Sequence, residues 1–344
     1  MKNRESNFEL ARIISMMMII GLHYLNADMG GVLGNVEYGS INYLVAHLFE
    51  SVFIVGVNIF VLITGYFLID KEYVKVKNII NLYIIMIFYN IVFLVIGIWS
   101  GEVTFSIKEC ILSILPFLGG RRWFVQTYIL LYVISPFLNV MLRGLSKRGY
   151  RLLLFIEIIV VIWASFLPNS PINDNGYGIL NFIILYSISG YIKLHYKTSR
   201  SSWYYIKMYS FFIIVTFLFS FTKFENKAWG YVFISNILGA VMLFLFYKNI
   251  SIENNKIINY ISKFTFPIFL IHSDFSIRNI IYQRILKCNY FYYSNLFVLH
   301  LFLSIIIIFT LSMLIDIPRK KIFSLIINKK LNAQKINKCE IKAI

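Results

Sequence analysis

The sequence predicts an all-α polytopic membrane protein with about ten transmembrane helices and both termini in the cytoplasm. Of its 344 residues, 59% are hydrophobic and only 14% are charged, and the mean hydropathy is +0.72, far above the balance of a soluble domain. The hydrophobic residues gather into runs of roughly 16 to 25 residues, the length that a helix needs to cross about 30 Å of hydrocarbon. The basic residues concentrate on alternate connecting segments, as expected when those segments face the cytoplasm.

The runs predict ten spans in chain order, each meeting the length requirement. They are residues 8–25, 44–69, 79–99, 123–142, 152–167, 179–194, 204–222, 229–247, 264–282 and 295–316. The ninth is interrupted by the polar residues Ser273, Asp274 and Arg278. The longest connection is 100–122, and we expect its apolar part, 107–118, either to cover the bundle as an amphipathic segment or to re-enter the membrane over a cavity.

The net charge of +17 is explained by the placement of the basic residues. They gather on the segments predicted to lie inside, among them the stretch after the second span and the tail from Arg319 to Lys342. This bias places both termini inside and requires an even number of spans. We therefore expect a multi-pass protein of the bacterial plasma (inner) membrane that attracts anionic lipid head groups and has no nucleic-acid partner.

The domain organisation is expected to be simple. Residues 1–316 form a transmembrane domain, and residues 317–344 form a basic cytoplasmic tail that mixes Ile and Leu with Lys, as a helix on the inner membrane surface does. Arg12 lies inside the first apolar stretch and no small-residue cleavage site follows, so this span is expected to be retained. The sequence has no phosphate-binding loop, HExxH or CxxC motif, and it predicts no metal.

Ionisable residues inside the predicted spans are the first functional candidates, because a charge in hydrocarbon costs a few kcal/mol or more. Arg12 and His23 are eleven residues apart, which is about 1,100° of rotation, about 20° past three turns, and roughly 16 Å of rise. They are predicted to share one helix face, with Arg12 in the inner leaflet and His23 near the outer mouth. Two other interpretations stay open: Arg12 snorkels while paired with Glu9, and His23 is a packing histidine.

Two further pairs carry weaker signals. His47 and Glu50 are three residues apart near the outer end of the second span and can share a face, where they would orient His23 or bind an acceptor; packing or pairing with each other explains them equally well. His272 and Asp274 are two residues apart and lie on different helix faces, which argues against a serine–histidine–aspartate set.

The opening helix, with Arg12-x10-His23, resembles the signature of the acyltransferase 3 membrane enzymes, especially the branch that O-acetylates bacterial surface polysaccharides. Three other stretches are similar to motifs of that family and occur in its order. They are NIFVLITGYF from Asn58 to Phe67, Trp123-Phe124 followed by Tyr128, Tyr132 and Pro136, and the segment from Pro267 to His272. The resemblance covers about residues 8–316.

The resemblance implies an enzyme that moves an acetyl group from cytoplasmic acetyl-CoA to a hydroxyl of a cell-surface polysaccharide or of its lipid-linked precursor. His23 is the expected base, since a neutral imidazole with a pKa of about 6.5 can take the proton of an attacking hydroxyl. An acyl-histidine intermediate is the alternative role of the same residue. Arg12 would hold the thioester carbonyl or a phosphate of the donor.

Supporting roles follow from the same resemblance. Lys75 and Lys77, where many relatives carry an arginine pair, would attract the anionic nucleotide end of CoA, although ordinary inner-surface lysines explain them as well. Trp123, Tyr128 and Tyr132 would line a sugar-binding mouth, and some relatives have an acidic residue in place of Tyr128. His272 is a supporting residue through the resemblance alone.

The main alternative is a transport or assembly protein, such as a flippase or polymerase for lipid-linked oligosaccharides. The sequence shows no paired broken helices, no half-to-half symmetry and no large outer loop, which argues against that alternative.

Overall fold

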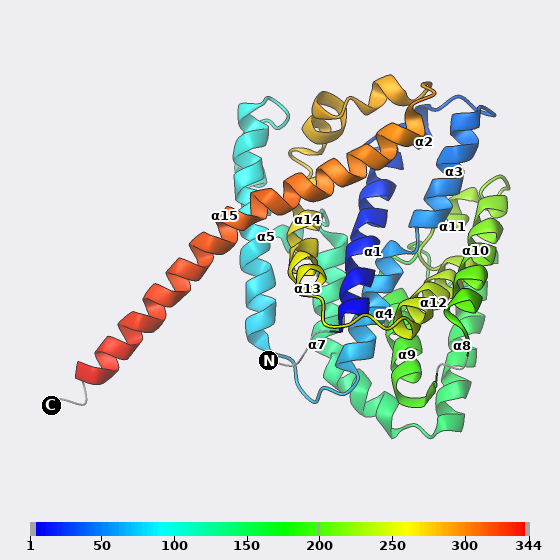
Figure 1. Ribbon diagram of the computed structural model, residues 1–344, viewed down its shortest axis with the longest axis horizontal. Helices are drawn as coiled ribbons and strands as arrows, with labels where there is room; N and C mark the ends of the chain where they lie inside the picture. The colour runs from blue at the N-terminus through cyan, green and yellow to red at the C-terminus, as the bar shows by residue number, and fades with distance from the viewer. Residues whose placement is uncertain (1–4, 198–199, 341–344) are drawn as a thin grey trace.

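The computed structural model is all-helical (Figure 1). It describes residues 5–197 and 200–340, with side chains up to residue 324. In order, the helices are α1 (Ser6–Leu25), α2 (Val32–Asn35), α3 (Ile41–Phe53), α4 (Gly56–Leu68), α5 (Val76–Trp99), α6 (Ile107–Ile114), α7 (Trp123–Gly144), α8 (Lys147–Phe166), α9 (Ile179–His195), α10 (Ser202–Phe219), α11 (Glu225–Ala228), α12 (Ile234–Asn249), α13 (Lys256–Ile261), α14 (Thr265–His272) and α15 (Phe297–Glu340). A π-helical turn covers Ile280–Ile285.

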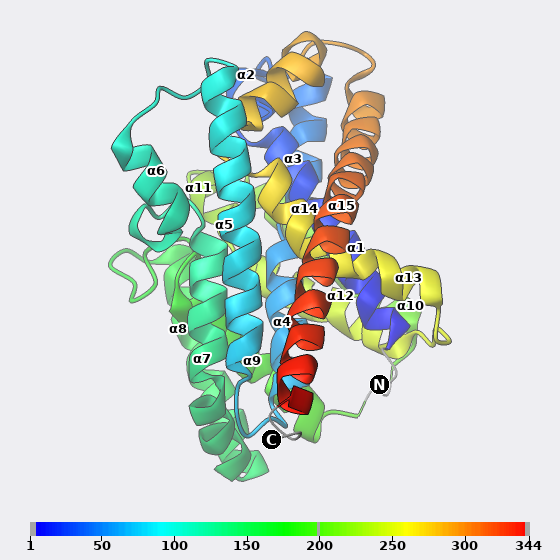
Figure 2. The same cartoon turned by 90° about the vertical axis from the view of Figure 1, so that its left-hand side faces the viewer.

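The helices account for nine of the ten predicted spans. In the described part of the chain, seven are long and apolar enough to cross a membrane, counting α3 and α4 as one, and α9 and α12 are shorter apolar helices. The start of α1 and the end of α15 lie on the same side of the molecule (Figures 1 and 2). The chain is therefore a multi-pass membrane protein, as the sequence predicts.

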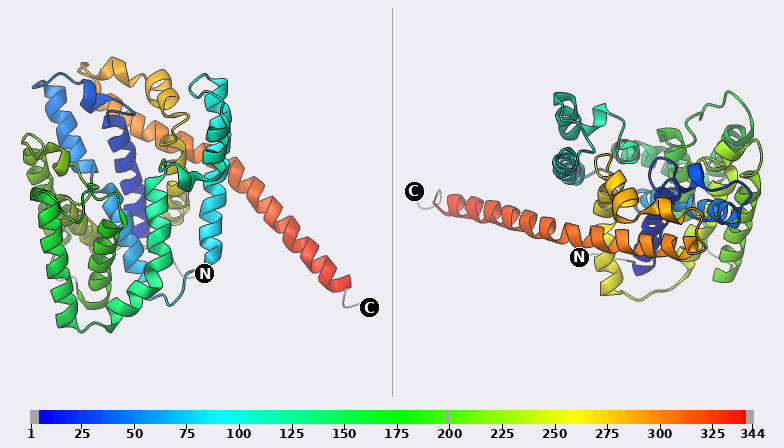
Figure 3. Two further views of the ribbon diagram at one scale, coloured as in Figure 1. Left: turned by 180° about the vertical axis from the view of Figure 1, so that it is seen from behind. Right: turned by 90° about the horizontal axis from the view of Figure 1, so that it is seen from above.

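Helix α1 lies at the centre of the bundle, in contact with α3, α4, α12, α14 and α15 (Figure 3). In its most apolar stretch 72% of the residues are buried inside the protein, against 28% for α5. The peripheral helices expose large apolar side chains such as Phe137 and Trp203. Lipid is the natural partner of such surfaces, and the buried central helix is the one that carries the candidate site.

The second span is interrupted, which the sequence did not predict. Helix α3 ends at Phe53 and α4 begins at Gly56, with Ile54 and Val55 forming a turn between them. Gly56 packs on α1 so closely that a Cβ there would come within 3.0 Å of the Ser15 carbonyl oxygen. The break therefore lies where this span packs on α1.

The ninth predicted span, 264–282, is wrong in its extent. Helix α14 stops at His272 after eight residues. The Ser273 hydroxyl donates to the Phe269 carbonyl (2.6 Å), and Asp274 Oδ1 accepts from the Ser276 amide (2.8 Å). These side-chain bonds to the backbone compete with continued helix, and helical structure instead precedes α14, in α13.

The 100–122 connection folds back along α5, where Tyr83 donates to the Ile114 carbonyl (2.8 Å) and Asn90 to the Ser113 carbonyl (3.3 Å) (Figure 2). Helix α6 in this connection has no buried residue, and the amphipathic and the re-entrant alternatives both stay predictions. Helix α15 continues without a break through the predicted domain boundary at residues 316 and 317.

Candidate functional site

One stripe of α1 faces a cavity of about 440 Å³. The stripe consists of Arg12, Met16, Ile19, Leu22 and His23, and Asn26, directly after the helix, continues it. Arg12, Met16, Ile19 and His23 are spaced by four, three and four residues. This spacing follows a single face of an α-helix. The predicted shared face of Arg12 and His23 is therefore confirmed, and one continuous internal space joins them.

Arg12 belongs both to the cavity and to a local ion pair. Its Nη1 donates to Glu9 Oε1 at 2.7 Å, and 27% of its side chain is exposed. The pairing with Glu9 that the spacing allowed is thus present. It coexists with a place in the cavity lining, so the guanidinium keeps donors available to a ligand, because it has five and this bond uses one.

His23 lies beside a second imidazole. The ring centroids of His23 and His272 are 4.9 Å apart. His272 Nδ1 lies 2.6 Å from the Ile268 carbonyl oxygen, which can only accept, so Nδ1 carries the hydrogen and Nε2 carries the lone pair. His272 Nε2 and His23 Nδ1 are both buried and have no hydrogen-bond partner among the described residues.

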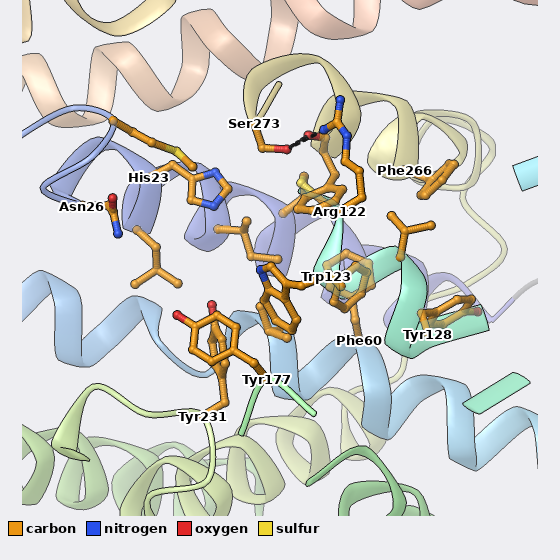
Figure 4. A pocket seen from close by; sticks show the side chains of 18 of the residues that line it. His23, Asn26, Phe60, Arg122, Trp123, Tyr128, Tyr177, Tyr231, Phe266 and Ser273 are labelled. Carbon is orange, nitrogen blue, oxygen red and sulfur yellow. Dashed lines mark hydrogen bonds between the residues drawn. The ribbon is translucent and has the colours of Figure 1, made fainter. Parts of the chain in front are cut away.

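A network of polar contacts holds Arg122, the residue directly before α7, against the end of α14. Arg122 donates to the Leu270 carbonyl (3.2 Å), to Ser273 Oγ (3.2 Å) and to Asn90 Oδ1 (3.0 Å), and it forms an ion pair with Asp274 (Figure 4). Arg122 and Asp274 are each 4% exposed. We call Asn90, Arg122, Ser273 and Asp274 the Arg122 cluster; it fixes one wall of the cavity.

The structure divides the other predicted site residues into two groups. Glu50, Trp123 and Tyr128 line the cavity. His47 lies behind it: its Nδ1 is 2.9 Å from Ser220 Oγ, and its ring packs 4.9 Å from that of Trp229. His47 therefore supports the cavity wall and neither pairs with Glu50 nor orients His23 directly.

Tyr132 also lies outside the lining and has a structural contact instead. Its hydroxyl accepts hydrogen bonds from the Asn78 side chain (3.0 Å) and from the Lys75 backbone amide (3.3 Å), which ties α7 to the start of α5. Lys75 and Lys77 themselves are exposed and do not line the cavity. Their predicted contact with CoA stays a prediction.

The lining residues that were not predicted as site residues from the sequence include Arg121, Arg122, Tyr177, Trp229, Tyr231 and Arg278. Arg278 holds its guanidinium 5.0 Å from the centre of the Phe275 ring. The aromatic residues come from connections between helices, and in a chain that is 18% aromatic they carry no distinguishing signal. Arg122 precedes the recognised Trp123-Phe124 pair, which was the one available clue.

A sequence model of the acyltransferase 3 family, described as an acyltransferase domain, matches residues 5–317. Comparisons with curated proteins and with solved structures found no match. The family match covers every helix that lines the cavity, from α1 to α14.

Proposed function

The chain belongs to the acyltransferase 3 family and is a membrane acyltransferase, and we propose that it moves an acetyl group from cytoplasmic acetyl-CoA to a hydroxyl of a cell-surface polysaccharide or of its lipid-linked precursor. The observation that carries the proposal is the stripe of α1, which joins Arg12 to His23 through one cavity. We further propose that the membrane is the bacterial plasma membrane, as the distribution of basic residues favours.

The chemistry assigned to His23 is proton transfer. The acceptor hydroxyl oxygen attacks the thioester carbonyl carbon while the imidazole takes the hydroxyl proton; the new C–O bond forms, the C–S bond breaks, and the departing sulfur recovers the proton. The place of His23 in the cavity lining supports this role, since a general base must lie within reach of the proton that it takes. The alternative acyl-histidine route uses the same imidazole as nucleophile.

Arg12 and His272 are assigned supporting roles in this reaction. Arg12 would stabilise the oxyanion that develops on the thioester carbonyl, or hold a phosphate of the donor. His272, whose tautomer is set by its bond to Ile268, would orient the His23 ring from behind. His272 is thus a positioning residue.

The proposal is tested by measuring base-labile acetate on the surface polysaccharide of cells that carry wild-type or variant protein. His23→Ala is expected to lower acetyl-ester formation by about 10²- to 10⁴-fold, the usual contribution of a general base. Arg12→Ala is expected to lower it by about 10²- to 10³-fold, as the loss of an oxyanion donor does.

His195→Ala is the matched control, because this histidine packs on Tyr150 and Tyr191 and does not line the cavity. Protein level in the membrane is measured for each variant. Wild-type ester in the His23 variant would refute the proposal. A flippase or polymerase would instead change the amount of polysaccharide while leaving its acetyl content per sugar unchanged.

A further inference from the structure

The part of the cavity near His23 contains a group of three aromatic side chains (Figure 4). Trp123 is the first residue of α7, Tyr177 precedes α9 and Tyr231 precedes α12. The ring centroids of Trp123 and Tyr177 are 4.4 Å apart, those of Tyr177 and Tyr231 5.1 Å, and those of Trp123 and Tyr231 5.6 Å. We call these three residues the aromatic corner.

The backbone that carries the aromatic corner is held at several points. Asn58 Nδ2 donates to the Tyr231 carbonyl (2.8 Å), and Thr127 Oγ1 donates to the Tyr177 carbonyl (3.2 Å). Gly176 has a φ of 86°, and a Cβ at this position would lie 2.6 Å from the backbone nitrogen that follows Tyr231. Only glycine fits there without strain, so the two connections are locked together and the corner is preformed.

Two further lining residues hold polar atoms without a partner. Glu50 is only 8% exposed, and its Oε2 has no hydrogen-bond partner among the described residues; the same is true of Trp229 Nε1. Both residues line the same cavity as the aromatic corner. A buried oxygen that accepts and a buried N–H that donates are both costly when unpaired.

These features together indicate the class of ligand. An acceptor and a donor on the wall of one cavity complement hydroxyl groups, which both donate and accept. Aromatic faces suit the apolar C–H face of a pyranose ring.

We propose that the aromatic corner, Glu50 and Trp229 form the acceptor subsite, which binds one neutral pyranose ring. This proposal rests on the proposed function. The ring stacks on the aromatic corner, its hydroxyls bond to Glu50 Oε2 and Trp229 Nε1, and another hydroxyl is presented to His23. His47 supports this subsite through its contact with Trp229.

The subsite is tested by binding and by turnover. Full-length protein in a detergent without a sugar head group is titrated with methyl β-glucoside, methyl β-galactoside and methyl N-acetyl-β-glucosaminide, and intrinsic tryptophan fluorescence is followed. Glu50→Leu and Trp229→Phe are each expected to raise the dissociation constant of the bound glycoside and the acceptor KM about tenfold or more, the loss of one buried hydrogen bond.

Glu157→Gln is the matched control, because Glu157 is a carboxylate within α8 that bonds to Ser187 (2.6 Å) and does not line the cavity. His23→Ala is expected to abolish transfer while glycoside binding persists. Glycoside binding that depends on Glu50 in a protein that transfers no acetyl group would refute the proposed function and support the subsite. Absence of quenching by all three glycosides, or unchanged constants in both subsite variants, would overturn the subsite while leaving the proposed function standing.

Discussion

Two sets of buried polar atoms surround the same cavity and differ in how they are satisfied. In the Arg122 cluster, Arg122 donates to three oxygens and pairs with Asp274. In the second set, His23 Nδ1, Glu50 Oε2, Trp229 Nε1 and His272 Nε2 have no partner among the described residues. Satisfied networks hold a shape, whereas unsatisfied buried atoms lower stability unless a ligand completes them. The first set therefore builds the cavity, whereas His23, Glu50 and Trp229 of the second set line it and belong to the proposed site.

The largest effect is expected from breaking the Arg122 cluster. Asp274→Ala leaves the 4% exposed Arg122 without its counter-charge, which typically lowers the free energy of unfolding by about 3–5 kcal/mol. Glu50→Leu is the comparison variant: it removes an unpartnered carboxylate, so its stability is expected to equal or exceed that of the wild type. Thermal unfolding in detergent measures both.

The contrast between the two sets fails if Glu50→Leu loses as much stability as Asp274→Ala. It also fails if Asp274→Ala unfolds at the wild-type temperature, because the buried pair would then contribute nothing to the wall that it is assigned to hold.

A smaller effect is expected at the second imidazole. His272→Phe keeps a ring beside His23 but removes the lone pair on Nε2, so we expect kcat for acetyl transfer to fall about tenfold, which is about 1.4 kcal/mol in the barrier. The acceptor KM and the unfolding temperature are expected to change little, since His272 does not line the cavity. An unchanged kcat would show that His272 only packs against His23. A fall in the unfolding temperature together with the fall in kcat would mean that His272 helps to hold the cavity wall, as the Arg122 cluster does.

The fold was largely predictable because hydrocarbon imposes one simple requirement on a span, its apolar length. Nine runs became helices, eight of them within about five residues of their predicted ends, while α15 continues to Glu340. The two differences, the break before Gly56 and the early end of α14, arise where side chains or backbone contact another helix: Gly56 meets Ser15 and Asp274 meets Arg122. Such contacts depend on three-dimensional neighbours, which apolar length does not encode.

The candidate site was predictable to the extent that it follows one helix. Arg12 and His23 share a face by arithmetic alone, whereas Tyr177, Trp229 and Tyr231 come from connections whose position depends on tertiary contacts such as that at Gly176. His47 shows the same limit, since its spacing from Glu50 left a role in the site and simple packing equally open, and only the contact with Ser220 identifies packing. Periodicity identifies the face of a helix and does not identify which loop covers it.

The smallest effect on stability is expected at the ion pair of Arg121, the residue that precedes Arg122. Arg121 also pairs with a carboxylate, that of Glu109, through two hydrogen bonds of 2.6 and 2.8 Å, but the Arg121 side chain is 33% exposed, against 5% for that of Arg122. Solvent screens an exposed pair, so Glu109→Gln is expected to lower stability by less than about 1 kcal/mol. The loss of stability in Glu109→Gln is thus expected to be several-fold smaller than in Asp274→Ala, because the Arg121–Glu109 pair is less buried.

The pH dependence of stability shows whether Glu109 acts through its charge. The bond from Arg121 holds the pKa of Glu109 below its ordinary value, so the folded state favours the ionised carboxylate. The resulting stability is fully present above the unfolded pKa of about 4.3 and is lost as the pH falls through the lowered pKa of the folded state. Unfolding temperatures of wild type and Glu109→Gln, measured from pH 7 downward, are therefore expected to differ slightly at pH 7 and to converge in acid. A difference that persists or grows below pH 4 would mean that Glu109 acts through packing rather than through its charge.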